Sequence, residues 1–260
     1  MSIGVDELPR RIVLCEGIHD TAFWGAALKR LGCSKDARDP VSGKLGFASK
    51  TGAFIRLFQK GQKPKWKPDV SNELIGAATQ AVSDIVLCAD LDSFEDQPDF
   101  VEARKHRKQD MLRLPDGVSL ANGKRPQDCW DSSSLSAVFP IANQPVATRV
   151  SVALWGAGCA SDAGIPRKQT LERLICAAFV FAYPGSAWPV EHWLGSRSAP
   201  PALSLEEHKA FAASYMAGWY AKRDYQGFFQ AVWADQAIAE QLERLLQTTG
   251  TWAVIERVAV

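Results

Sequence analysis

Three short, almost wholly apolar runs place the strongest limit on how this chain of 260 residues can fold. They are RIVLC at residues 11–15, DIVLCA at 84–89 and RVSVALW at 149–155. Strands that are buried on both faces have continuous apolar sequences of this kind, and they occur in parallel sheets covered by helices. Segments with helical spacing lie between the runs. We therefore predict an α/β fold with a mainly parallel sheet flanked by helices.

The segments between and after these strands predict the domain organisation. Helices are expected over residues 20–31, 71–82, 99–112, 170–181, 205–222 and 234–247. A stretch rich in Pro, Gly, Asn and Ser at 115–145 indicates an irregular insertion, and the Pro- and Trp-rich residues 184–201 indicate a connector. We expect a sheet-containing domain over 8–183 and a C-terminal helical extension over 184–260.

Composition is that of an ordinary globular protein, and it excludes several classes. With 30 Lys plus Arg against 29 Asp plus Glu, overall charge does not indicate a polyanionic partner. Six cysteines without C-x-x-C spacing predict reduced, mostly buried thiols rather than a zinc site. The N-terminus lacks the pattern of a signal peptide, and the longest apolar run is too short to span a bilayer. We expect a cytoplasmic protein without a membrane partner.

Carboxylates follow two of the predicted strands. Glu16 comes directly after the first, and Asp90 and Asp92 follow the second in the sequence CADLDS. Ligands of parallel sheets bind at the carboxyl ends of strands, and residues two apart in extended chain point to the same side. Three such carboxylates repel each other unless a cation lies between them, and their oxygens suit Mg²⁺ or Mn²⁺. The alternative, that each acid caps a helix, stays open at this point.

These residues carry a resemblance to a known family. The segments LCEGIHD and LCADLDS resemble the two motifs of the Toprim domain, which topoisomerases, bacterial primases and several nucleases share. The resemblance implies a compact parallel α/β domain over 8–183. It also implies that Glu16 is a general acid/base or metal ligand and that Asp90 and Asp92 are metal ligands.

A narrower resemblance covers residues 12–222. The E-G-x-x-D form, with Asp20 four residues after Glu16, is similar to the Toprim nucleases of the OLD (overcoming lysogenization defect) class. This likeness implies a further acid at Glu172 and a catalytic lysine at Lys209, with Lys222 as the second choice. The implied enzyme is a metal-dependent endonuclease that uses two cations. Glu16, Asp90 and Asp92 would hold one, and Asp20 and Glu172 would help to hold the other. The resemblance leaves DNA and RNA open as substrates.

Members of that class with an ATPase carry it before the Toprim domain, whereas this sequence starts at the first Toprim strand. The segment LGFASKTG is no phosphate loop, because Lys44 and Ser49 occupy the positions that require glycine. The expected partner is therefore a separate ATPase subunit, and the resemblance implies a role in antiviral defence. Trp188 and Trp193 are candidate partner contacts. The alternative is that both pack the C-terminal helices onto the sheet.

Residues 43–68 carry seven basic side chains and no acid. We expect nucleic acid to lie along this segment, with Lys60, Lys63, Lys65 and Lys67 as phosphate contacts. The alternative is a solvated loop. Two other readings of the whole chain also remain at this stage. One is a non-catalytic Toprim-fold binding subunit of a larger complex, and the other is an enzyme of the primase or topoisomerase type.

Overall fold

The structure is a computed structural model that describes residues 9–39, 42–62, 64, 66–77, 81–106, 119–131, 136–196, 207–219 and 224–260. Its strands are β1 (Arg10–Cys15), β2 (Ser34–Arg38), β3 (Leu45–Ala48), β4 (Phe54–Gln59), β5 (Val82–Asp90), β6 (Trp130–Asp131), β7 (Ser136–Phe139) and β8 (Thr148–Trp155). Its α-helices are α1 (Ile18–Arg30), α2 (Ser71–Ala77), α3 (Phe100–His106), α5 (Leu171–Ala182), α6 (Ala187–Ser196), α7 (Glu207–Trp219), α8 (Tyr225–Ala234), α9 (Gln236–Thr248) and α10 (Thr251–Ala259).

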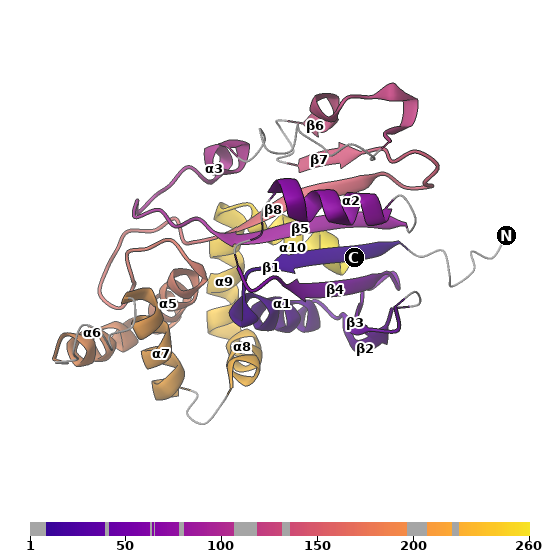
Figure 1. Cartoon of the computed structure of the whole chain (residues 1–260). Helices are drawn as coiled ribbons and strands as arrows, with labels where there is room; N and C mark the ends of the chain where they lie inside the picture. Colours follow the sequence, from indigo (N-terminus) through magenta and orange to yellow (C-terminus); the bar gives the residue numbers. More distant parts are fainter. Residues whose placement is uncertain are drawn as a thin grey trace. The chain divides into compact units, whose positions relative to one another are not determined.

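The described strands form one sheet in the order β2-β3-β4-β1-β5-β8-β7-β6 (Figure 1). β1 pairs in parallel with β4 and with β5. The Thr148 hydroxyl at the start of β8 donates to the Val82 carbonyl at the start of β5, and the Leu91 N–H beyond β5 donates to the Trp155 carbonyl at the end of β8. These two strands therefore also run in parallel. The outer strands β2, β3, β6 and β7 each pair antiparallel with their inner neighbour. The predicted α/β class and parallel core are confirmed, whereas the outer strands are antiparallel.

The chain forms two compact units. Unit 1 comprises Met1–Ala89, Val101–Ala153 and Ala253–Val260, and unit 2 comprises Asp90–Phe100 and Leu154–Trp252. The boundary expected at residues 183 and 184 lies inside unit 2.

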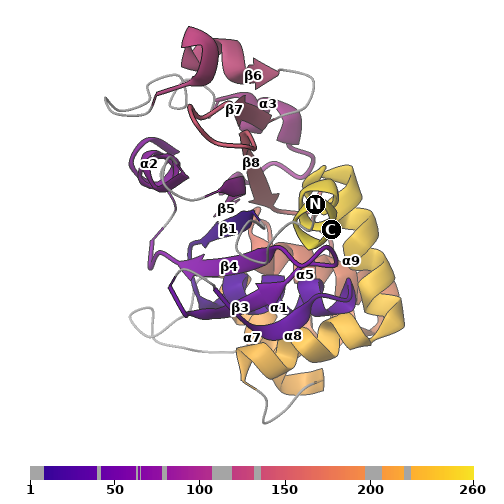
Figure 2. The ribbon, with the colours of Figure 1, turned by 90° about the vertical axis from the view of Figure 1, so that its right-hand side faces the viewer.

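Helices cover both faces of the central strands of unit 1. α1 and α10 lie on one face and α2 on the other (Figure 2). The connections from β1 to β4 and from β4 to β5 cross the sheet in opposite directions, and right-handed crossovers then place α1 and α2 on opposite faces. Buried Trp24 of α1 donates its indole N–H to the Cys88 sulfur of β5 at 2.9 Å. This packing explains why β1 and β5 are apolar on both faces.

The basic segment 43–68 is not a solvated loop throughout. It contains β3 and β4, and β4 is a parallel neighbour of β1. The first residues of β4, Phe54 and Ile55, are buried. Further along, the Arg56 guanidinium carbon lies 4.6 Å from the centroid of the Phe58 ring. The strand was missed because basic residues break up the apolar run.

Two further expectations were wrong. The residues taken as a connector form α6 as far as Ser196, and residues 197–201 lie outside the described part. The helix expected over 71–82 ends at Ala77, and Val82 is the first residue of β5. In both places polar and apolar residues alternate over too few positions to show a clear helical spacing.

The last helix of the chain belongs largely to unit 1. The Arg257 side chain donates to the Asp84 carboxylate of β5 at 3.0 Å and to the Ser151 hydroxyl of β8 at 2.6 Å. The Arg11 guanidinium of β1 donates to the Val258 carbonyl at 2.8 Å. These bonds fasten α10 across three strands, and such long-range contacts leave no local pattern in the sequence.

Unit 2 is built around the apolar helix α5, which packs against α7 and α9. The Phe179 ring of α5 stacks on Tyr215 of α7, with centroids 5.0 Å apart, and on Phe228 of α8 at 6.3 Å. The Tyr215 hydroxyl donates to the Gly164 carbonyl at 3.1 Å, which ties α7 to the loop before α5. The aromatic layer thus orders the helices around the segment that follows β8.

All six cysteines are free thiols, and five are buried, so the prediction of reduced thiols is confirmed. Burial raises the pKa of the Cys15, Cys88 and Cys176 thiols. In the described part of the chain no single helix is long and apolar enough to cross a membrane. Only the pair Leu171–Ala182 and Pro184–Ser196, bent by 119°, meets that length and composition together.

Candidate functional site

Glu16, the first predicted site residue, lies half-buried between β1 and α1 in unit 1. The residues that follow β4 are hydrogen-bonded to this turn. The Lys60 N–H donates to the Cys15 carbonyl at 2.8 Å, and the Gly61 N–H donates to the Glu16 carbonyl at 3.0 Å. The structure therefore brings Lys60 and Gly61, in the later part of the basic segment, beside Glu16, a proximity that the sequence did not indicate.

Asp20 lies in the first turn of α1, and its side chain is buried. Its Oδ2 accepts a hydrogen bond from the Gly17 N–H at 2.9 Å. A carboxylate here satisfies one of the free N–H groups at a helix start and interacts favourably with the helix dipole. Asp20 thus caps the start of α1, and its role as a metal ligand stays a prediction.

The basic residues predicted to contact nucleic acid are only partly described. The Lys60 ammonium pairs with Asp69 Oδ1 at 2.7 Å and lies 5.2 Å from the Phe58 ring centroid. Its charge is therefore already partly compensated. Lys63 and Lys65 lie outside the described residues, as does the side chain of Lys67.

In unit 2, Asp90 and Asp92 both contact the segment that leads into α5. Asp90 Oδ1 accepts from the Leu171 N–H, in the first turn of α5, at 2.9 Å. Asp92 Oδ1 pairs with the Lys168 ammonium at 3.0 Å, and the Asp92 side chain is 42% exposed. The Asp92 backbone has φ +61°, a left-handed conformation that is uncommon outside glycine. The structure thus brings the two aspartates together with the start of α5.

Gln169 holds this arrangement in place and is itself fully buried. Its carbonyl accepts from the Asp92 N–H at 2.9 Å, and its N–H donates to the Ser93 carbonyl at 2.8 Å. The side-chain amide donates to the Glu95 carbonyl at 2.7 Å and accepts from the Ala157 N–H at 2.8 Å. One residue therefore links the loop after β5 to the loop after β8.

Arg173 performs a similar role from the first turns of α5, where its guanidinium is fully buried. The guanidinium donates to the carbonyls of Ala157, Cys159, Pro166 and Arg167, to the Ser161 hydroxyl and to Asp96 Oδ1. Its distances to the Cys159 and Pro166 carbonyls are both 2.6 Å. The hydrogen bond from Ser161 lowers the pKa of Asp96, and the charge of Arg173 lowers it further. Several backbone carbonyls of the loop after β8 thus bind the buried Arg173 guanidinium.

The remaining predicted residues are placed as follows. Glu172 lies in the first turn of α5 and is buried, next to the residue that Asp90 caps. Lys209 lies exposed near the start of α7, and Lys222 lies outside the described residues. Among the residues that the structure describes, no three His, Cys, Asp or Glu side chains are positioned to share one metal ion.

The sequence-based reasoning missed Lys168, Gln169 and Arg173. A signal for Arg173 was present, because the helix LERLICAAFVFA is apolar on all sides except for Glu172 and Arg173. A helix of that kind is buried, so its two charged residues must be buried with partners. Lys168 and Gln169 carry no such signal, since their roles depend on contacts with the distant loop after β5.

Comparison with known proteins bears on this fold. No family model matches the sequence, and no curated protein matches it. The chain shares its fold with a hypothetical protein from Pyrococcus horikoshii OT3. The two structures superpose with a TM-score of 0.61 and 14% sequence identity, over 97% of this chain and 100% of the other. At that identity the likeness concerns the fold alone.

A protein of unknown function from Thermoplasma acidophilum was also compared. It shows 12% identity over 95% of this chain and 92% of its own, with a TM-score of 0.24. That score is too low to indicate a shared fold. The functional assignment therefore depends on the residues described above.

Proposed function

We propose that this chain is a metal-dependent phosphodiesterase of the Toprim type, similar to the OLD nucleases, that cleaves nucleic acid. The observation that carries the proposal is the placement of Asp92. Its carboxylate is exposed, while its backbone is held in a left-handed conformation by the buried Gln169. Strained backbone that the surroundings enforce occurs preferentially at functional sites.

Topology supports including Glu16 in the same reaction. β1 and β5 are neighbouring parallel strands, Glu16 follows the first and Asp90 ends the second. We propose that Glu16, Asp90 and Asp92 hold one divalent cation and that Asp20 and Glu172 help to hold another. Carboxylate oxygens are the donors that Mg²⁺ and Mn²⁺ prefer. Bound cations would stabilise charge on the scissile phosphate and activate the attacking water.

The lysines have distinct parts in this proposal. Lys168 supplies the positive charge beside Asp92, as an ammonium on a flexible stem that a cation can displace. Lys209 is the residue that the family resemblance assigns to the transition state, where it would offset negative charge on the phosphate. Glu16 would act as the acid/base that transfers a proton during the reaction.

A direct test is incubation of the purified chain with supercoiled plasmid and with single-stranded RNA, each with Mg²⁺, Mn²⁺ or EDTA. We expect cleavage of one substrate with a divalent cation and none with EDTA. Binding to the native state should also raise the melting temperature as the Mn²⁺ concentration increases. A chain that neither cleaves nor gains stability from either cation would contradict the proposal.

We also propose that nucleic acid contacts the segment 43–68, because Lys60 and Gly61 are hydrogen-bonded to the Cys15–Glu16 turn. Reversing Lys63, Lys65 and Lys67 to Glu should weaken binding at low salt and flatten its salt dependence, since each lost phosphate contact lowers the slope of log K against log salt by about 0.9 on duplex DNA. Lys60 is left unchanged because it forms an ion pair with Asp69, and its reversal to Glu would place two negative charges together. Filter binding between roughly 50 and 200 mM salt measures both quantities, and an unchanged slope would count against this interface.

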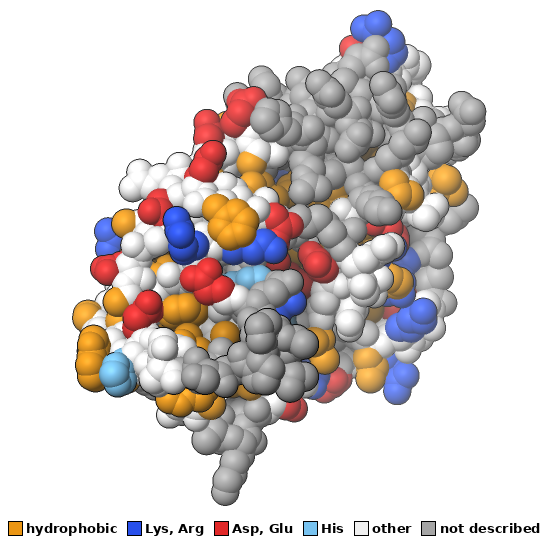
Figure 3. Space-filling model, turned by 60° about the vertical axis from the view of Figure 1, so that its left-hand side comes forward, with side chains coloured by type: hydrophobic (Ala, Val, Ile, Leu, Met, Phe, Trp, Pro, Cys, Tyr) orange, Lys and Arg blue, Asp and Glu red, His pale blue; other side chains and the backbone are white. Residues whose placement is uncertain are grey.

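A second candidate function is a non-catalytic subunit that docks a partner, such as a separate ATPase. The observation in its favour is on α6, where Trp188 is 68% exposed and Trp193 is 54% exposed. Figure 3 shows exposed hydrophobic side chains, with a histidine beside them, in the region of α6. Side chains this exposed are available to a partner, which supports the docking alternative. Trp188 stacks on His192 with centroids 4.9 Å apart, which holds the ring at the surface. A docking subunit would show no cleavage in the assay above.

A further inference from the structure

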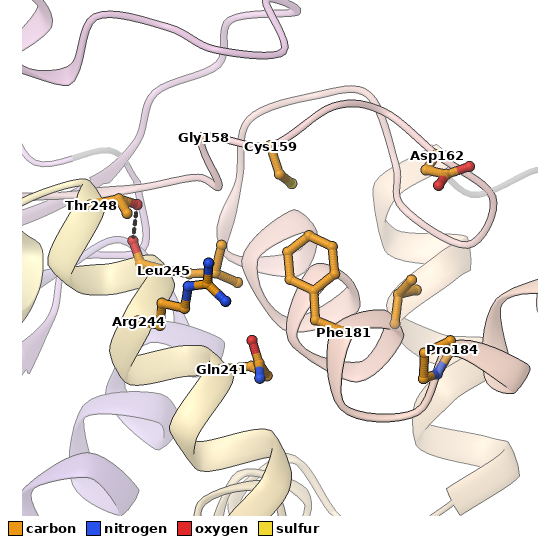
Figure 4. A pocket seen from close by; sticks show the side chains of 10 residues that line it. Gly158, Cys159, Asp162, Phe181, Pro184, Gln241, Arg244, Leu245 and Thr248 are labelled. Carbon is orange, nitrogen blue, oxygen red and sulfur yellow. Dashed lines mark hydrogen bonds between the residues drawn. The ribbon is translucent and has the colours of Figure 1, made fainter.

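A pocket of about 620 Å³ lies within unit 2, between α5, α9 and the loop after β8 (Figure 4). We call it the α5–α9 pocket. It is lined by Gly158, Cys159, Asp162, Val180, Phe181, Pro184, Gln241, Arg244, Leu245 and Thr248. Pockets for small molecules typically measure roughly 300–1,000 Å³ and combine apolar walls with a few polar groups. Neither the proposed cleavage chemistry nor the proposed nucleic-acid contacts use these residues.

One wall of the pocket is a polar stripe of α9. Gln241, Arg244 and Thr248 are spaced at i, i+3 and i+7, so they share one side of the helix. Arg244 is exposed, and among the described residues it has no ion pair. Figure 4 shows its guanidinium directed toward the space beside Phe181. This wall therefore offers a cation and an amide to a ligand.

The facing wall is aromatic and apolar. Residues 171–180 of α5 are all buried, whereas Phe181 in its last turn is 42% exposed. Buried Leu245 and Val180 lie beside the ring as pocket lining. A flat aromatic ligand placed on Phe181 would cover this apolar surface and gain stacking energy.

Asp162 supplies negative charge at another part of the rim. Its Oδ1 accepts from the Ala163 N–H at 2.7 Å, and its carbonyl accepts from the Ile165 N–H at 3.0 Å, so the turn that presents it is ordered. Figure 4 places Asp162 well apart from Arg244, with Phe181 between them. Across the pocket a ligand would therefore meet the Asp162 carboxylate, then the Phe181 ring and then the Arg244 guanidinium.

We propose that the α5–α9 pocket binds a nucleoside monophosphate. The base would stack on Phe181, its exocyclic N–H groups would donate to Asp162 or Gln241, and the phosphate would pair with Arg244. A simple anion would leave the aromatic wall uncovered, and a neutral aromatic molecule would leave Arg244 without a counter-charge. The proposal does not depend on nuclease activity, because it concerns binding to residues outside that chemistry.

The test is isothermal titration calorimetry of the full chain with AMP, GMP, CMP and UMP in EDTA, which removes the proposed cleavage cations. We expect at least one nucleotide to bind in a 1:1 ratio. Arg244→Gln and Phe181→Ala should each weaken that binding about tenfold or more, since each removes a charged or stacking contact. Lys29→Gln, which removes one exposed positive charge from α1 in unit 1, is the charge-matched control and should leave the affinity unchanged.

Two further ligands separate the halves of the proposed site. Adenosine and inorganic phosphate alone should each bind more weakly than AMP. Of these two fragments, phosphate should bind more weakly to Arg244→Gln, whereas adenosine should bind to it as it does to the wild type. The absence of binding by all four nucleotides would overturn the proposal. Nucleotide binding that is equally strong in Arg244→Gln and Lys29→Gln would overturn it as well. If Arg244→Gln or Phe181→Ala lowers the melting temperature, Arg244→Lys and Phe181→Leu replace them in the titrations, because they keep the charge and the apolar bulk respectively.

Discussion

Glu16→Gln should reduce metal-dependent cleavage by about 10²–10⁴-fold, the usual contribution of a general acid/base, without unfolding the chain. The substitution preserves the shape of a half-buried side chain and removes both its charge and its ability to transfer a proton.

Asp92→Asn should likewise abolish cleavage. It should change the free energy of unfolding by about 1 kcal/mol or less, because the Lys168 pair that it weakens is partly exposed to solvent. Initial cleavage rates and thermal melts of the same samples measure both effects.

Asp90 is expected to behave differently from Asp92. Like-charge repulsion alone predicts that Asp90→Ala stabilises the protein. The structure reverses that sign, because Asp90 accepts the Leu171 N–H at the start of α5. Loss of a carboxylate at a helix start destabilises by about 0.5–2 kcal/mol, so Asp90→Ala should melt earlier as well as lose activity.

Glu256→Gln is the control for these three variants, since it neutralises an exposed acid on α10. It should match the wild type in cleavage rate and in melting temperature. A purely structural role for the acids predicts the opposite pattern, in which activity falls only in proportion to the unfolded fraction. Folded Glu16→Gln and Asp92→Asn proteins with wild-type cleavage rates would refute the proposed site.

Arg173→Met should lower stability more than any substitution considered above. The guanidinium is fully buried, and its loss leaves the carbonyls of Cys159 and Pro166 without this donor and removes one of two side-chain donors to Asp96. Each buried acceptor left without a hydrogen bond typically costs about 1–3 kcal/mol, and because several are lost together we expect a total of about 3–5 kcal/mol. For a chain of this size the melting temperature should fall by roughly 6–20 °C. Calorimetric or circular dichroism melts measure it.

Arg167→Met is the matched control, because the Arg167 side chain is exposed and only its backbone carbonyl contacts Arg173. That variant should stay within about 0.5 kcal/mol of the wild type. Arg173→Lys should fall between the two, since an ammonium has three donors where the guanidinium has five. If Arg173→Met and Arg167→Met melted at the same temperature, the buried guanidinium would not order the loop as described.

The local patterns of the sequence were sufficient for the central elements of the fold. The apolar runs predicted β1, β5 and β8, because strands buried on both faces admit only apolar side chains over several consecutive residues. The same reasoning placed Glu16 directly after β1 and Asp90 at the end of β5, both confirmed as positions in the chain. Whether those acids bind a cation stays a prediction.

The remaining features depend on contacts between residues far apart in the chain. β4 is a strand because it pairs with β1, despite a basic sequence that favours a loop, and α10 is held to unit 1 by Arg11, Asp84 and Ser151. Gln169 and Arg173 acquired their roles in the same way, since their partners lie in loops after β5 and β8. By itself, therefore, the sequence determined the buried parallel core and the order of the acids along the chain. Only the tertiary structure decided the sheet edges, the capping of α5 by Asp90 and the conformation of Asp92, because hydrogen bonds between distant segments have no local pattern that a sequence can display.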